Sequence, residues 1–142
     1  MKMTKKFKIL GKYIKDISGE TKDLETYLYV KDHIFKYRLA IDINSKALKD
    51  KLIEINTTLK FEDKEESKKR SYFEIVFSTI VRVEDDIKEK KDLEKIILCD
   101  AQIEIYSDLE KSLLDLLHNS GYPGIKFEKK IDFENLYNQR SK

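Results

Sequence analysis

The chain has 142 residues, of which 40% are hydrophobic and 39% charged, and its 29 basic and 27 acidic residues leave a net charge of +2. This length and apolar content predict one folded domain over residues 1–142. The balanced charge favours neither a nucleic-acid partner nor an anionic membrane. No apolar run approaches the about 18 residues of a membrane helix, and the single cysteine excludes an internal disulfide, so we expect a cytoplasmic protein.

Period-two alternation dominates the first half of the chain. Apolar residues take every second position in three segments, 35–44, 53–62 and 73–83. Such alternation predicts half-buried strands of an antiparallel sheet with one solvated side. The third segment also carries Val76 and Ile80 on its second face, which suggests that a subunit partner covers that face.

An earlier segment, 7–18, is interpreted as a fourth strand. Phe7, Ile9, Tyr13 and Ile17 are expected on one face, with Gly11 at a bulge or bend. The polar segments 44–50 and 63–70 are expected to be hairpin loops, and 19–33 an irregular, partly buried connection.

The second half of the chain changes to helical spacing. Leu109, Leu113, Leu116 and Leu117 predict an amphipathic helix of about three turns beginning near Ser107, and Gly121 and Pro123 mark its end. Segment 93–105 fits a crossover over the sheet. Segment 131–139 predicts a short helix capped by Asp132. Strands followed by helices give an α+β fold.

The inventory of catalytic side chains is small, so we expect no enzyme. His33, His118 and Cys99 show no spacing that joins a nucleophile to a base, and Cys99 lies in an apolar run typical of a buried thiol. Four glycines and two histidines form no phosphate loop or metal motif, so no cofactor or metal is expected. Aromatic residues outside the strands leave two alternatives open, satellite core packing or an apolar groove for an extended peptide.

The order of several short motifs resembles the SecB family of bacterial protein-export chaperones over almost the whole chain. Residues 13–20, Tyr-Ile-Lys-Asp-Ile-Ser-Gly-Glu, are similar to the family's Tyr-x-Lys-Asp-(Ile/Leu)-Ser-x-Glu. The other segments that carry the resemblance are Lys31-Asp32-His33, Leu39-Ala40-Ile41-Asp42, Gly121-Tyr122-Pro123 and Ile131-Asp132-Phe133-Glu134-Asn135-Leu136-Tyr137.

The resemblance implies a four-stranded antiparallel sheet, a crossover loop, one long helix and a short C-terminal helix, assembled as a homotetramer built from two dimers. It also implies an ATP-independent chaperone that holds unfolded or precursor polypeptides and delivers them to the translocase motor SecA. The acidic residues that match the family's SecA-docking positions are Asp16, Glu20 and Glu74. The residues in the client-groove segments are Ile103, Ile105, Ile125, Phe127, Leu136 and Tyr137.

Three departures from the family pattern keep a second role open. Family members are usually strongly acidic, whereas this chain has a net charge of +2 and ends Gln139-Arg140-Ser141-Lys142. His33 stands where tryptophan is usual. Of the family's Cys-Pro-x-x-Leu-Phe-Pro-Tyr-Ala-Arg stretch only Cys99 and Tyr106 remain. The alternative is a SecB-like adaptor, or a chaperone that shields an antitoxin, with a dedicated partner and no SecA delivery.

Overall fold

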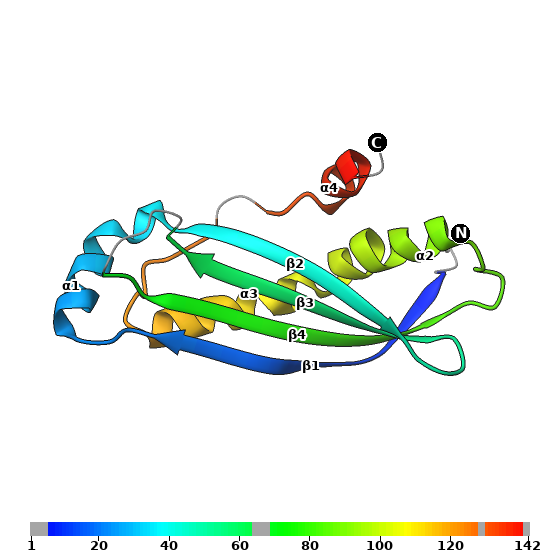
Figure 1. Cartoon of the computed structure of the whole chain (residues 1–142), viewed down its shortest axis with the longest axis horizontal. Helices are drawn as coiled ribbons and strands as arrows, with labels where there is room; N and C mark the ends of the chain where they lie inside the picture. The colour runs from blue at the N-terminus through cyan, green and yellow to red at the C-terminus, as the bar shows by residue number, and fades with distance from the viewer. Residues whose placement is uncertain (1–5, 64–68, 128–129, 141–142) are drawn as a thin grey trace.

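One antiparallel sheet and one long helical rod make up most of the molecule (Figure 1). The computed structural model describes residues 6–63, 69–127 and 130–140. The strands are β1 (Phe7–Glu20), β2 (Arg38–Ala47), β3 (Leu52–Glu62) and β4 (Tyr72–Val83), in the spatial order β1-β4-β3-β2. The helices are α1 (Leu24–His33), α2 (Lys90–Lys95), α3 (Ala101–Asn119) and α4 (Phe133–Arg140).

The two faces of the sheet differ in what covers them. On the face that we call the helix face, β3 and β4 bury a row of apolar residues against the rod, including Ile55, Leu59, Phe73 and Ile75, each 0% exposed. On the opposite face, the open face, the alternate residues of β3 are half-buried throughout. The alternation predicted for 53–62 and 73–83 is thereby confirmed.

The strand predicted at 35–44 begins later, at Arg38, and runs on to Ala47. Phe35 was expected on its buried face, but it lies in a 3-10 turn, Ile34–Lys36, and is 73% exposed. This turn continues directly from α1, so the chain becomes extended only at Tyr37. The loop expected at 63–70 lies partly outside the described residues.

Strand β1 contains two bulges that change which side chains share a face. Register shifts fall between Ile9 and Gly11, near the glycine where a bulge was expected, and between Ile14 and Asp16. Because each bulge inserts one residue, the alternation reverses there. Tyr13 pairs with Ser78 and belongs to the open face, so its predicted place beside Phe7 and Ile9 is wrong.

The connection predicted as irregular at 19–33 contains helix α1. Asp23 caps it, since its Oδ1 accepts a hydrogen bond of 2.8 Å from the backbone N–H of Thr26. Only Thr26 and Val30 of this helix are buried. Four consecutive apolar residues, 27–30, hide the helical period, which explains why the pattern does not reveal this helix.

The long helix begins far earlier than Ser107. Residues 90–119 are helical throughout, as α2, a π turn at Ile96–Asp100 and α3, and the crossover is reduced to residues 84–89. The chain's one proline lies at 123, so none interrupts this stretch. The side chain of Gln102 links the π turn to the sheet. Its Nε2 donates a hydrogen bond to the carbonyl oxygen of Ile97 (3.1 Å), and its Oε1 accepts one from Oγ1 of Thr57 on β3 (3.0 Å).

The main core lies between α3 and the helix face. Ile105, Leu109, Leu113 and Leu117 follow one another at intervals of four residues and are all 0% exposed. Each such burial is favourable by roughly 1.5–3 kcal/mol. Among the described residues, no helix combines the length and apolar character that a membrane crossing requires.

Position 121, just after α3, requires glycine for two reasons: its backbone conformation and its close contact with α1. Its φ is +107°, and a β-carbon there would lie 2.7 Å from Cε1 of Tyr27. We expect Gly121→Ala to lower the free energy of unfolding by about 1–3 kcal/mol, measured by urea denaturation at fixed protein concentration. The matched control is Gly124→Ala, because a β-carbon at Gly124 meets nothing within 4 Å. Equal stability of both variants would contradict this reading of the turn.

Candidate functional site

A cavity of about 260 Å³ lies between the edge strand β2, the π turn and helix α4. Strand β2 contributes Ile41, Asp42 and Ile43, and the π turn contributes Leu98. The α4 wall consists of Phe133, Leu136 and Tyr137. Six of these seven side chains are apolar or aromatic and one is a carboxylate, so the cavity presents both apolar and polar surface.

Helix α4 is held over this cavity by contacts with α3. Phe133 is 4% exposed and packs edge-on against the ring of Tyr106, with 5.6 Å between ring centroids. Lys130, just before α4, pairs with Glu110 of α3 and lies over the Tyr106 ring. The Asp132 carboxylate accepts a hydrogen bond of 3.0 Å from the N–H of Asn135, which confirms the predicted cap. Burial, followed by the nearby Glu110, raises the pKa of Tyr106 to about 12.

The six residues of the predicted client groove lie in three places. Leu136 and Tyr137 line the cavity. Ile125 and Phe127 are half-buried and pack against the main core. Ile103 and Ile105 belong to α3: Ile103 is 52% exposed, whereas Ile105 is fully buried and offers no surface in this conformation. Their binding role stays a prediction.

A second group of exposed apolar side chains lies at the α1 end of the molecule. Leu24 and Leu28 are one helical turn apart and are 69% and 51% exposed, and Phe35 follows in the 3-10 turn. Cys99, by contrast, is fully buried beside Tyr106 and Phe133, as its apolar context predicted. Burial raises the pKa of the Cys99 thiol above its ordinary value, so the less reactive protonated form dominates near neutral pH.

The three predicted docking carboxylates converge on one end of the open face, which we call the acidic patch. Ser18 pairs with Glu74, and Asp16 and Glu20 lie two residues to either side of Ser18 on β1. Glu74 accepts a hydrogen bond of 2.6 Å from Tyr72 and lies 3.6 Å from the ammonium of Lys60. Burial, and then the hydrogen bond to Glu74 and its negative charge, raise the pKa of Tyr72 to about 12, with smaller effects of Glu62 and Asp16.

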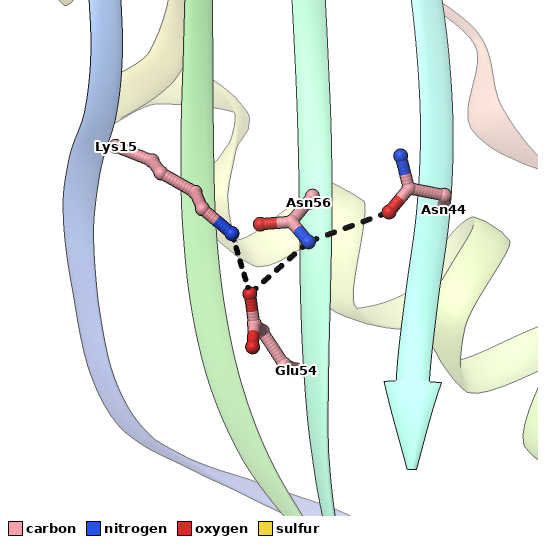
Figure 2. Close-up of polar contacts among 4 residues, drawn as sticks. All are labelled: Lys15, Asn44, Glu54 and Asn56. Carbon is pink, nitrogen blue, oxygen red and sulfur yellow. Dashed lines mark hydrogen bonds and ion pairs between the residues drawn. The ribbon is translucent and has the colours of Figure 1, made fainter.

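A chain of polar contacts crosses the middle of the open face (Figure 2). Lys15 of β1 reaches across β4 to the carboxylate of Glu54 on β3, at 2.9 Å. Asn56 donates to the same carboxylate (3.1 Å) and to Asn44 of β2 (3.3 Å). These bonds lower the pKa of Glu54, with Lys15 as the first cause. Glu54 is thereby neutralised locally and adds little to the acidic patch.

Comparison with known proteins decides the family. The family model described as "SecB: Preprotein translocase subunit SecB" matches residues 1–142. The chain belongs to the SecB family. A relative from Pelagibacter ubique (strain HTCC1062), described as "Putative protein-export protein SecB", is 56% identical over 139 residues, which cover 98% of this chain and 99% of the relative.

A solved structure supports the SecB-like fold. The Mycobacterium tuberculosis Rv1957 SecB-like chaperone, in complex with a ChAD peptide from the Rv1956 HigA1 antitoxin, superimposes with a TM-score of 0.63 at 10% identity. The match covers 88% of this chain and 91% of that chain. The predicted α+β architecture is confirmed, and the family and its relatives support a chaperone of protein export.

The sequence pattern did not single out most of the cavity lining. Ile41 and Ile43 fell within the strand expected at 35–44, and Phe133 within the short helix expected at 131–139. Leu98 belonged to the segment 93–105 that was expected to be a crossover, and Asp42 appeared only as part of a motif. The alternation along β2 predicted that Ile41 and Ile43 share one face of the strand. That they border a cavity follows only from the position of α4 in the structure.

The polar chain in Figure 2 predicts a distinctive titration of Glu54. Its pKa, measured by NMR, should lie below the ordinary value and should rise toward that value in Lys15→Met. Lys46→Met is the matched control, because Lys46 is the last of the causes and should change the pKa much less. Since the folded-state pKa is depressed, the pair stabilises the fold above the unfolded pKa, and this contribution is lost as pH falls through the folded pKa. Equal shifts in both variants would contradict the assigned contact.

Proposed function

We propose that this SecB-family chain holds extended, non-native segments of other polypeptides, without ATP, before they are exported. The observation that carries the proposal is the cavity between β2 and α4, whose lining residues are mainly apolar or aromatic. Leu136 at its wall is 44% exposed although it is a large apolar residue. In the isolated chain, part of the Leu136 side chain stays in contact with water. An apolar client side chain that enters the cavity removes this surface and its own from water, and this burial favours binding.

The form of the surfaces favours capture of unfolded rather than folded clients. Apolar side chains are exposed in separate small groups, at α4, at α1 with its 3-10 turn, and on β1. A folded partner requires one continuous complementary surface, whereas an extended chain reaches several separated patches in turn. Holding by many weak apolar contacts also lets a client leave without nucleotide hydrolysis.

We also propose that the acidic patch is the docking site for the translocase motor SecA. Asp16, Glu20 and Glu74 lie together on a face that no helix of the described chain covers, away from the cavity. Clustered carboxylates attract a basic segment and mainly increase the rate of encounter. Because Glu74 is paired with Lys60, Asp16 and Glu20 supply most of this attraction.

The edge strand β1 supports the homotetramer that the family resemblance implies. It has 14 residues and only β4 as a neighbouring strand, and Leu10, Ile14 and Ile17 are each 44–50% exposed. A long edge with exposed apolar side chains is prone to pair with another chain. We propose that β1 forms part of the contact within a dimer and that two dimers associate. Light scattering measures this assembly directly, and a monomeric mass would remove the proposal.

A dedicated antitoxin partner is the second candidate. The support for it is that the mycobacterial chaperone of similar fold was solved with an antitoxin peptide. The two roles differ in the number of clients. Capture from lysate should return many nascent polypeptides for an export chaperone and one stoichiometric protein for a dedicated shield.

Leu136 provides the test of holding. Leu136→Glu places a charge in the cavity wall, and we expect an about tenfold loss of affinity for an unfolded model protein, from lost apolar burial and from desolvation of the carboxylate. The readout is the amount of chaperone that halves aggregation of the unfolded protein. The matched control is Asn138→Glu, which adds the same charge at an exposed position of the same helix outside the cavity lining. Failure of the unmutated protein to suppress aggregation at several-fold excess would refute the proposal.

Charge reversal tests the docking site. Asp16→Lys and Glu74→Lys should each weaken SecA binding by about tenfold at low salt, with less effect at high salt where screening reduces the attraction. Asp86→Lys, an exposed change of equal charge in the crossover, should leave binding nearly unaltered. Client holding by all three variants should persist. Absence of SecA binding to the unmutated protein would contradict the docking proposal and leave the holding proposal standing.

A further inference from the structure

We propose that a second cavity, at the end of the sheet far from α1, binds a free fatty acid, a linear apolar chain that ends in a carboxylate. This inference goes beyond the holding of polypeptides and concerns a different place in the fold. It is carried by three features: an apolar cavity, two lysines in its lining that have no partners, and a turn whose backbone conformation disfavours the lysine that it carries.

The cavity, which we call the turn cavity, lies where the β2–β3 turn, the crossover and α2 meet. Figure 1 shows the turn and the crossover at the same end of the molecule. The volume of the turn cavity is about 330 Å³, which falls within the range of about 300–1,000 Å³ that is typical of small-molecule sites. It shares no lining residue with the cavity beneath α4.

The lining is apolar because the helix face extends beyond the cover that the rod provides. Ala47 and Ile53 are opposite each other on β2 and β3, and Leu93 is the only α2 residue in the lining. Ile53 and Ile87 are buried, whereas Leu48 is 39% exposed. A ligand chain in this cavity removes apolar surface from water, which is favourable by about fourfold in affinity for each methylene group that becomes buried.

The charged residues of the lining are Lys51 and Lys88, and both are exposed. In the described part of the chain, neither ammonium group forms an ion pair or a hydrogen bond. No carboxylate belongs to the lining, although Asp50 and Glu89 are their neighbours in sequence. A ligand carboxylate therefore meets two cations that have no competing partner.

The lining also favours a fatty acid over a segment of polypeptide. Apart from the two lysines, its side chains are all aliphatic, and none of them contains a hydrogen-bond acceptor. The N–H groups of a buried peptide backbone would lose their water without gaining a side-chain partner, which is unfavourable. An alkyl chain has no such groups, and its one polar end meets the lysines.

The β2–β3 turn fixes Lys51 beside the cavity in a backbone conformation that favours glycine. The φ angles are 62° at Asp50 and 66° at Lys51. The N–H of Leu52 donates a hydrogen bond to the carbonyl of Lys49 (3.2 Å), and the N–H of Val83 donates to the carbonyl of Lys51 (3.0 Å). A two-residue turn with both φ angles positive normally carries glycine at its second position. Lysine at this position lowers stability, and such strain is typical of residues that serve a binding site.

The first test compares three probes of equal chain length: decanoate, decanol and decylamine, each below its micelle-forming concentration. Decanoate should shift the methyl NMR signals of Leu48, Ile53 and Ile87, and its dissociation constant should be about 3- to 10-fold lower than that of decanol at low salt. Decylamine should bind most weakly, because its ammonium group meets like charges. Equal affinity for decanoate and decanol would overturn the role of the lysines.

The double variant Lys51→Gln/Lys88→Gln should bring the affinities for decanoate and decanol together. The matched control is Lys49→Gln/Lys90→Gln, which removes two exposed lysines next to the same segments but outside the lining, and it should retain the preference. Equal loss of preference in both double variants would show a diffuse effect of charge and would overturn the site.

Filling the cavity tests its location. Ala47→Phe places a ring in the turn cavity and should weaken decanoate binding by about tenfold or more. Ala40→Phe is the matched control, because Ala40 is also exposed on β2 but lies outside the lining, and it should leave binding nearly unaltered. Decanoate shifts that persist in Ala47→Phe, or that occur only at the cavity beneath α4, would overturn the assignment.

Replacement of the turn lysine should change stability and binding in opposite directions. Lys51→Gly relieves the positive φ and should raise the melting temperature by about 2–4 °C, while it lowers the preference for decanoate over decanol. A lower melting temperature would contradict the strained turn, and an unchanged preference would contradict the role of Lys51.

The aggregation assay separates this inference from the proposed holding function. Ala47→Phe should still suppress aggregation of an unfolded protein, because the client cavity lies elsewhere. Loss of suppression in this variant, or displacement of decanoate by an uncharged apolar peptide of equal affinity, would assign the turn cavity to clients and overturn the fatty-acid site. Failure of the unmutated protein to suppress aggregation, with decanoate binding as described, would remove the holding function alone.

Discussion

Packing of α3 on one face of the sheet is the interaction on which the remaining structure depends. Ile105, Leu109, Leu113 and Leu117 bury the centre of β3 and β4, and Gln102 bonds to Thr57 within the same layer. A single helix covers only a strip of the sheet, so the outer strands β1 and β2 receive less cover. Both proposed interaction edges, β1 for a second copy and β2 for a client, follow from this incomplete coverage.

The two faces of the sheet separate two tasks. The cavity lies at the β2 edge beneath α4, and the acidic patch lies on the open face near the β1–β4 pair. A client held at the first surface does not occupy the second, so a carrier and its receiving partner can engage at the same time. The polar contacts from Lys15 to Asn44 cross the middle of the open face, beside the acidic patch (Figure 2). Within them, Lys15 compensates the negative charge of Glu54.

Local periodicity predicted the elements whose burial is regular. In strands β3 and β4 buried residues alternate with less buried ones, apart from Ser78, and the strands were recognised from that pattern. Helix α1 was missed because its apolar residues are contiguous, and the face of Tyr13 was wrong because the bulge between Ile9 and Gly11 reverses the alternation of β1 before it. Of the candidate site, sequence supplied Leu136 and Tyr137. The cavity itself depends on where α4 docks, and Phe133 and Lys130 establish that through tertiary contacts with α3.

Photo-crosslinking from the wall of the cavity tests the central claim most directly. With a photoreactive amino acid at position 136, irradiation in the presence of a permanently unfolded protein should give crosslinks that map near its apolar segments. The folded form of the same protein should give almost none, and the same probe at position 115, on the exposed side of α3, should give few with either form. Equal yields from positions 136 and 115, or equal yields with folded and unfolded protein, would contradict the account.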